Sequence, residues 1–357
     1  MLRIFSLIVV AFSFVPQVYA LDFKDISIHG YSSFEVERQI SEKGSGDTNN
    51  SFDMDLFDVV LNFQLSDRVR VAADLTWEHG TATEDGTGNA AVEYAFTEIT
   101  YTDAVKLRFG KFLLPFGYFN EIHTAKPSTL SVKEAASTNK TERLAKNGER
   151  FFPRWGAGMG LKGSMASAGL DYDILVTNGE QDEEGNSGNP YEKDNNLSKA
   201  LTARVHYRPS TGLLVSPSYY KDQMSADVKD MEHSVTSYGL YLNYSFFDAN
   251  VIAEFVEGKF VKVEIDEDAA EKDKNNWTQQ GWFIQLAYAI DATTPYLRYE
   301  LINPDVDIKK DVGTDTIIGV NHEIDDGLFG KLEYHMYGGE FDDSHWTEVK
   351  LALVAGW

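Results

Sequence analysis

The sequence predicts an all-β protein, built as one 16-stranded antiparallel transmembrane β-barrel, and three observations lead to this prediction. Apolar and polar residues alternate with a period of two along most of the chain, as in "VRVAADLTWEH" at residues 69–79. Short turns and long polar loops follow one another regularly between the alternating segments, which is typical of membrane-spanning barrels. After residue 20, no apolar run approaches the ~20 residues that a transmembrane helix needs.

The first twenty residues have the pattern of a secretory signal peptide. Arg3 supplies a positive charge, residues 4–15 form an apolar run, and Ala20 ends a plausible small-residue cleavage site. We therefore expect residues 1–20 to be a signal peptide and residues 21–357 to form the barrel. The alternative is an uncleaved anchor helix, for which the apolar run is short.

The composition excludes several classes of protein. The chain has no cysteine, so an exported domain must be held together by packing or by a hydrogen-bonded ladder rather than by disulfides. Phe, Trp and Tyr make up 13% of the residues, and this aromatic surface must be buried or lie against lipid. The formal net charge of −24 makes nucleic acid an unsuitable partner.

Sixteen segments show the alternation of a strand with two unlike faces. The segments 25–37, 91–102, 249–261 and 315–323 leave open which face is which. The predicted strands are 25–37, 52–65, 68–79, 91–102, 105–113, 154–164, 168–178, 198–208, 213–224, 234–246, 249–261, 277–290, 294–302, 315–323, 328–338 and 345–357.

The connections between these segments alternate in length. A short turn rich in Asp, Ser, Gly or Asn follows every even-numbered strand. A two-sheet sandwich also has period two, but it does not require this asymmetry over sixteen strands. The longer loops follow the odd-numbered strands, at 38–51, 80–90, 114–153, 179–197, 225–233, 262–276, 303–314 and 339–344.

The alternation continues to the final residue of "HWTEVKLALVAGW", where Leu351, Leu353 and Trp357 share one face. We expect this segment to pair with the first strand and so to leave no unpaired edge in lipid. An aromatic final residue also resembles the C-terminal signal that the barrel-assembly machinery of Gram-negative outer membranes reads. Phe is usual in that signal, and Trp357 differs from it.

A barrel of sixteen strands is wide enough to leave an aqueous channel. The segment "LRFGKFLLPFGYFNE" at residues 107–121 resembles the strand and loop signature of Gram-negative outer-membrane porins, especially the phosphate-selective porin (O/P-type) superfamily. The resemblance implies that the long connection 114–153 folds inward as a constriction loop. It also implies an outer-membrane location, contact with lipid and lipopolysaccharide, and a homotrimer. The matching residues are Gly110, Lys111, Phe112, Pro115, Phe116 and Gly117.

We therefore expect a porin that passes small hydrophilic solutes or inorganic anions by passive diffusion. The connection 114–153 has six basic residues against four acids, which favours a weak preference for anions at the constriction. Pairing of mixed charges across the lumen, with little net selectivity, is the alternative. The candidate constriction residues are Lys126, Lys133, Lys140, Arg143, Lys146 and Arg150. The candidate pore-wall residues are Arg70, Lys106, Arg108, Arg204 and Arg298, with Lys162, Lys331 and Lys350 also facing the lumen. The expected lumenal acids are Asp74, Asp171, Asp173, Glu300, Glu333 and Glu348.

No cofactor or metal site is predicted. The outer loops 179–197 and 264–276 are strongly acidic, so their carboxylates could bind Ca²⁺ or Mg²⁺, although a solvated acidic surface explains them more simply. "GMGLKG" fits a nucleotide-binding pattern, but another strand follows it rather than a helix. We expect Gly156, Gly158 and Gly160 instead to form a wall without side chains against which the constriction loop packs.

Two other classes of function are alternatives to a porin. A barrel that serves as a sleeve or scaffold for an envelope partner protein would lack an inward loop and have a wide, uncharged lumen. An outer-membrane barrel hydrolase would need Ser, His and an acid grouped together, whereas the eight histidines are scattered along the chain and no G-x-S-x-G occurs. We therefore do not expect an enzyme.

Overall fold

The computed structural model describes most of the chain outside the N-terminus and parts of the long loops. The predicted signal peptide, residues 1–20, lies outside the described residues, as do Lys140, Arg143 and Lys146. The described residues are 25–40, 50–79, 90–139, 141, 144–145, 148–180, 191–194, 196–224, 232–264, 273–308, 312–339 and 345–357.

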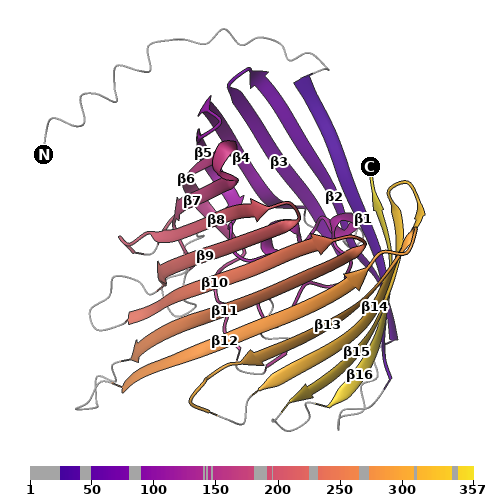
Figure 1. Ribbon diagram of the computed structural model, residues 1–357. Coiled ribbons are helices and arrows are strands. Elements are labelled where there is room, and N and C mark those ends of the chain that lie inside the picture. Colours follow the sequence, from indigo (N-terminus) through magenta and orange to yellow (C-terminus); the bar gives the residue numbers. More distant parts are fainter. Residues whose placement is uncertain are drawn as a thin grey trace, which may run out of the picture.

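The described residues form a closed barrel of sixteen strands in which each strand pairs with its neighbours in the chain and β1 pairs with β16 (Figure 1). All of the pairings are antiparallel. The predicted fold class and strand count are therefore confirmed. The strands are β1 (Ile26–Gln39), β2 (Asn50–Ser66), β3 (Val69–Glu78), β4 (Ala91–Thr102), β5 (Val105–Leu113), β6 (Trp155–Met165), β7 (Leu170–Thr177), β8 (Ala200–Ser210), β9 (Leu213–Gln223), β10 (Glu232–Phe246), β11 (Ala249–Glu264), β12 (Asp273–Tyr288), β13 (Thr293–Asn303), β14 (Gly313–Asp325), β15 (Leu328–Gly339) and β16 (Trp346–Gly356).

The two faces of the strands differ as the alternation predicts. On β10, Leu240, Leu242 and Phe246 point outward and are 44%, 39% and 40% exposed. The residues at the alternate positions, such as Ser237 and Tyr241, face the interior and are buried. An apolar outer surface and a polar interior are what a barrel in lipid requires. Among the residues that the structure describes, no helix is long and apolar enough to cross a membrane.

Short turns join the strands at one end of the barrel. Two-residue turns follow β2, β4, β8, β10 and β14, and the 3₁₀ turn η6 (Ala166–Ala168) follows β6. Gly169, Gly212 and Gly327 in these turns have φ of 62°, 82° and 74°, a left-handed conformation that glycine adopts without strain. The predicted pattern of short turns is confirmed, and the long connections all leave the opposite end.

The barrel closes where β1 pairs with β16, with Tyr31 opposite Gly356. The backbones of Gly30 and Trp357 exchange two hydrogen bonds of 3.1 Å each. The Trp357 ring lies over Gly30, where a Cβ would overlap it, and its centroid is 5.5 Å from that of Phe57. The predicted pairing of the final segment with the first strand is therefore confirmed. We call this junction the closure seam.

Candidate functional site

The longest connection, between β5 and β6, packs against the inner wall of the barrel. Its two ends contribute Phe116, Phe151 and Phe152 to a buried apolar cluster with wall residues such as Tyr220 on β9 and Val256 on β11. The rings of Phe116 and Phe152 stack with their centroids 4.3 Å apart. Burial of these rings keeps both ends of the connection against the wall.

Three wall glutamates on alternate strands accept hydrogen bonds from backbone amides of this connection. Tyr118 N–H donates to Glu254 on β11 at 2.9 Å, and Ser137 N–H donates to Glu300 on β13 at 3.0 Å. Val132 N–H donates to Glu333 on β15 at 3.0 Å. All three carboxylates are buried, with exposed fractions of 5%, 1% and 0%. Charge-assisted bonds of this kind are stronger than those between neutral groups.

Two of the predicted constriction cations, Lys126 and Lys133, form ion pairs with carboxylates of β1 and β2. Lys126 Nζ lies 3.1 Å from Glu35 Oε1 and 3.0 Å from Asp55 Oδ2. Lys133 Nζ lies 2.5 Å from Glu35 Oε2 and 2.9 Å from Asp55 Oδ1. Burial alone would lower the pKa of Lys133, but the charges of Glu35 and Asp55 outweigh burial and raise that pKa.

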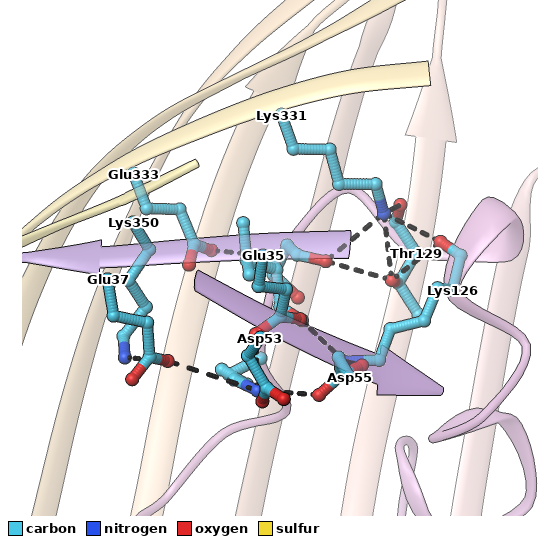
Figure 2. Close-up of polar contacts among 12 residues, drawn as sticks. Glu35, Glu37, Asp53, Asp55, Lys126, Thr129, Lys331, Glu333 and Lys350 are labelled. Carbon is cyan, nitrogen blue, oxygen red and sulfur yellow. Dashed lines mark hydrogen bonds and ion pairs between the residues drawn. The ribbon is translucent and has the colours of Figure 1, made fainter. Parts of the chain in front are cut away.

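A wall lysine makes the reverse contact with the same connection (Figure 2). Lys331 on β15 donates from Nζ to the carbonyl oxygens of Lys126 at 2.6 Å, Thr129 at 2.6 Å and Ser131 at 3.2 Å. The helix η4 (Lys126–Ser128) begins this stretch. Residues 126–133, which we call the docked segment, therefore contact wall strands on both sides of the closure seam.

Glycines on the wall allow the connection to approach closely, but they are not the predicted ones. A Cβ at Gly281 on β12 would overlap the carbonyl oxygen of Ser137, and a Cβ at Gly313 on β14 would overlap that of Leu144. The packing of the connection on Gly156, Gly158 and Gly160 stays a prediction, since the nearest atoms there belong to another element. A Cβ at any of these three would meet residues of the adjacent strand β7, because β6 lies close to its own neighbour there.

The remaining candidate residues are placed differently. Arg150 is described and is exposed, while Lys140, Arg143 and Lys146 lie outside the described residues. Arg298 lies on the inner wall as expected, but it is only 1% exposed. Its Nε is 2.7 Å from Glu300 Oε1, and both of its Nη atoms donate to the carbonyl oxygen of Lys133 at 3.3 Å. Arg298 thus lies underneath the connection.

The other four predicted wall residues line two cavities between β2 and β8, away from the closure seam. The first cavity, of about 230 Å³, contains Arg70 and Arg108. The second, of about 200 Å³, contains Lys106 and Arg204 near the short-turn end of the barrel. The structure thus groups these four residues in cavities, and their role as the wall of a pore remains a prediction.

Mixed charges line these cavities. The cationic side chains are Arg70, Lys106, Arg108, Lys162, Arg204 and Arg208, and the carboxylates are Asp103, Glu121, Asp171 and Asp173. Many of them pair: Asp173 lies 3.2 Å from Arg204 and 3.4 Å from Lys162, and Glu121 also contacts Arg204. The cations outnumber the lining carboxylates by six to four, and Glu98, which pairs with Arg70 and Arg108, reduces the positive surplus to one.

Metal ligation has little support in the described part of the chain. There, no group of three or more His, Cys, Asp or Glu residues could hold a metal ion. Much of the acidic loops 179–197 and 264–276 lies outside the described residues, so the suggestion of Ca²⁺ or Mg²⁺ binding there remains a prediction.

A closed, wide barrel with a polar interior and a long connection against its inner wall defines the porin fold of bacterial outer membranes. No family model and no curated protein sequence matches the chain. Three solved structures that resemble it are an anion-selective porin from Comamonas acidovorans, OmpF of Salmonella typhi in complex with daunomycin, and the outer membrane channel DcaP of Acinetobacter baumannii.

These likenesses extend over nearly the full length of the chains. The Comamonas porin is 11% identical with a TM-score of 0.65, over 93% of this chain and 99% of its own. OmpF is 10% identical with a TM-score of 0.65, over 95% and 100%. DcaP is 11% identical with a TM-score of 0.63, over 96% and 100%. At these identities the likeness establishes the fold.

Proposed function

We propose that this protein is an outer-membrane porin that passes small hydrophilic solutes by passive diffusion. The observation that carries the proposal is the closed sixteen-strand barrel, whose interior is lined with charged side chains and whose outer face is apolar. A barrel of this width holds water unless it is filled. The structural likeness to three outer-membrane channels supports the same conclusion, and the local resemblance of residues 107–121 supports the finer assignment to the O/P-type superfamily.

The connection 114–153 narrows the channel in this proposal. It is held to β1, β2, β11, β13 and β15 by the ion pairs and hydrogen bonds described above. The two cavities on the β2–β8 side then belong to the route that solutes take. A sleeve for a partner protein would need a wide lumen without such a connection, so the docked connection favours a channel over a sleeve.

A weak preference for anions is the second part of the proposal. Lys126 and Lys133 are paired with Glu35 and Asp55, so the preference would come mainly from the small surplus of cations at the two cavities. Arg150 and the three candidate cations outside the described residues would add to it. Positive charge on a low-dielectric wall raises the local concentration of anions.

Assembly and location complete the proposal. The barrel resides in the bacterial outer membrane, in contact with lipid and lipopolysaccharide, and forms a homotrimer. The trimer form of OmpT, an outer membrane protein of Vibrio cholerae, is 12% identical and covers 93% of this chain with a TM-score of 0.61, which supports the trimer.

The conductance of single channels in planar bilayers tests the channel itself. We expect stepwise currents from the purified protein, and larger steps after residues 126–139 are replaced by a short Gly–Ser linker. Equal step sizes in both proteins would contradict the narrowing role. A complete lack of current, with folding checked by resistance to SDS at room temperature, would contradict the porin.

Reversal potentials in a KCl gradient test the preference for anions. We expect a small potential of the sign that indicates chloride permeation, and a shift towards cation permeation when Arg70 and Arg108 are both replaced by Gln. The matched control is Lys259→Gln, a lysine near the loop end of β11 whose side chain is 59% exposed. A clear cation preference in the wild type would overturn this part of the proposal. Ester and peptide hydrolysis assays on the same preparation test the enzyme alternative, and we expect no turnover.

A further inference from the structure

The first of the two cavities combines guanidinium groups with an aromatic surface. It lies between β2, β3, β4, β5 and the helix η3 (Asn120–Ile122), and its volume is about 230 Å³. The lining side chains that matter below are Asn62, Arg70, Tyr94, Phe96, Arg108 and Phe112. Aromatic side chains are unusual on the wall of a water-filled route, because water solvates them poorly.

The two guanidinium groups share one carboxylate. Arg108 Nε donates to Glu98 Oε2 at 3.0 Å, and Arg70 Nη2 lies 3.6 Å from the same oxygen. Arg70 also donates to Asn62 Oδ1 at 3.3 Å. A guanidinium has five N–H donors, so these contacts leave donors of both groups available to a ligand. Glu121, the other carboxylate at this cavity, contacts Arg204. Arg108 Nη1 also lies 4.0 Å from Asp173, which pairs with Arg204 and Lys162 as well. Four cations and the three carboxylates Glu98, Glu121 and Asp173 therefore leave this network with one net positive charge.

The aromatic side chains form a row beside these arginines. The ring centroid of Phe96 is 5.7 Å from that of Tyr94 and 5.6 Å from that of Phe112. The guanidinium carbon of Arg108 lies 4.2 Å from the Phe96 centroid and that of Arg70 lies 5.5 Å from it. Phe96 and Phe112 also belong to the apolar cluster at the base of the connection, which fixes the position of the row.

We propose that this cavity is a binding subsite for an organic carboxylate with a flat aromatic body, of which benzoate is the simplest example. The carboxylate accepts hydrogen bonds from Arg70 and Arg108, while the ring packs on the row Tyr94–Phe96–Phe112. A monoanion balances the single surplus charge. Phosphate has no ring that could pack on the aromatic row, and its second charge would be repelled by Glu98. The inference rests on the proposed channel function, because the cavity would lie on the route of the solute.

Block of the KCl current by added anions tests the inference. Sodium benzoate, sodium acetate and sodium phosphate are added in turn to single channels in a planar bilayer. We expect benzoate to reduce the current in a saturable way, with a half-blocking concentration roughly tenfold below those of acetate and phosphate. Ring stacking together with apolar burial is sufficient for a difference of about this size.

Two variants and one control separate the parts of the subsite. We expect Arg108→Gln to raise the half-blocking concentration of benzoate roughly tenfold, through loss of a charge-assisted contact. Phe96→Leu should raise the half-blocking concentration of benzoate to nearly that of acetate and leave the value for acetate unchanged. The control is Lys106→Gln, which removes the same charge two residues away on the same strand but lines the other cavity. It should change the ion selectivity and preserve the ratio of benzoate to acetate.

The outcomes distinguish the two proposals. Ordinary KCl currents with equal block by benzoate and acetate overturn the subsite and leave the channel in place. A protein without current overturns the channel, and calorimetric titration of benzoate into the detergent-solubilised protein then tests the cavity directly. Should Phe96→Leu fail to fold, Tyr94→Leu provides the same comparison at the other end of the aromatic row. An effect of Lys106→Gln equal to that of Arg108→Gln would also overturn the subsite.

Discussion

Replacement of Lys133 by Gln should release the docked segment from the wall. In the wild-type protein, Lys133 Nζ lies 2.5 Å from Glu35, 2.9 Å from Asp55 and 3.9 Å from Glu37. Glu35 is 0% exposed and Asp55 is 7% exposed, so neither carboxylate is solvated by bulk water. After the substitution, Lys126 would be the remaining cation beside both of them.

The size of the effect follows from the burial of these charges. Removal of one partner from a buried ion pair costs about 3–5 kcal/mol. Here Lys126 would balance one of the two carboxylates, and the other would stay buried without a cation of its own. Each 1.4 kcal/mol corresponds to about a factor of ten, so local opening of the segment should become more frequent by about two to four orders of magnitude. The amide of Val132 reports this opening, because it donates to the buried carboxylate of Glu333.

Hydrogen exchange of the purified protein in detergent, followed by mass spectrometry of peptides covering residues 126–137, measures the opening. The control is Lys259→Gln, whose side chain is 59% exposed and lies 3.7 Å from Glu257. Exposed pairs of this kind contribute at most about 1 kcal/mol, so the control should exchange like the wild type. If Lys133→Gln also exchanged like the wild type, these ion pairs would not hold the segment in place.

Three further predictions concern the same elements. Gly281→Ala should displace the connection, because the new Cβ would overlap the carbonyl oxygen of Ser137, and should alter the single-channel conductance; Gly330→Ala, where the nearest atom is 3.3 Å away, should not. Trp357→Ala should destabilise the closure seam by about 1–2 kcal/mol in urea unfolding through loss of ring packing, whereas Trp357→Phe should cost less than about 1 kcal/mol. The raised pKa of Lys133 means that its contribution is complete below the ordinary value of 10.5 and is lost as the pH rises through the raised value. The difference in stability between wild type and Lys133→Gln should therefore stay constant from about pH 7 to about pH 10 and shrink only in stronger alkali.

The period of two was sufficient to predict the strands and the short turns, because a barrel in lipid imposes unlike faces on every strand. For β11, one of the four strands whose facing was left open, the structure gives a physical reason. On β11, the inward residues Ile252, Val256 and Phe260 are buried and apolar. They pack against the inner connection, Ile252 in a cluster with Phe119 and the others in the cluster with Phe151. A lumen wall that faces protein instead of water loses its polar signature.

The contacts that hold the connection were not predictable in the same way. Glu300 lies on the expected lumenal face, but its partner is a backbone amide 163 residues away in the sequence. No side-chain pattern marks which amide that is. A weaker sequence signal for these contacts was available. Glutamates occupy inward positions on alternate strands, and a glycine such as Gly281 lies on the strand between two of them. Similarly, the sequence predicts Arg70 and Arg108 on the wall but does not indicate that both lie beside Phe96.

The position of the docked segment across the closure seam has a consequence for the order in which the protein assembles. Its contact with Glu35 spans 91 residues of the chain and its contact with Lys331 spans 205. Glu35 on β1 and Lys331 on β15 come close to each other only after β1 has paired with β16. The docked segment must therefore bind to the wall after the barrel has closed, because its contacts join residues far apart in the sequence. In an intermediate trapped before that step, the docked segment would not be bound to the wall, and proteases would cleave the chain there first.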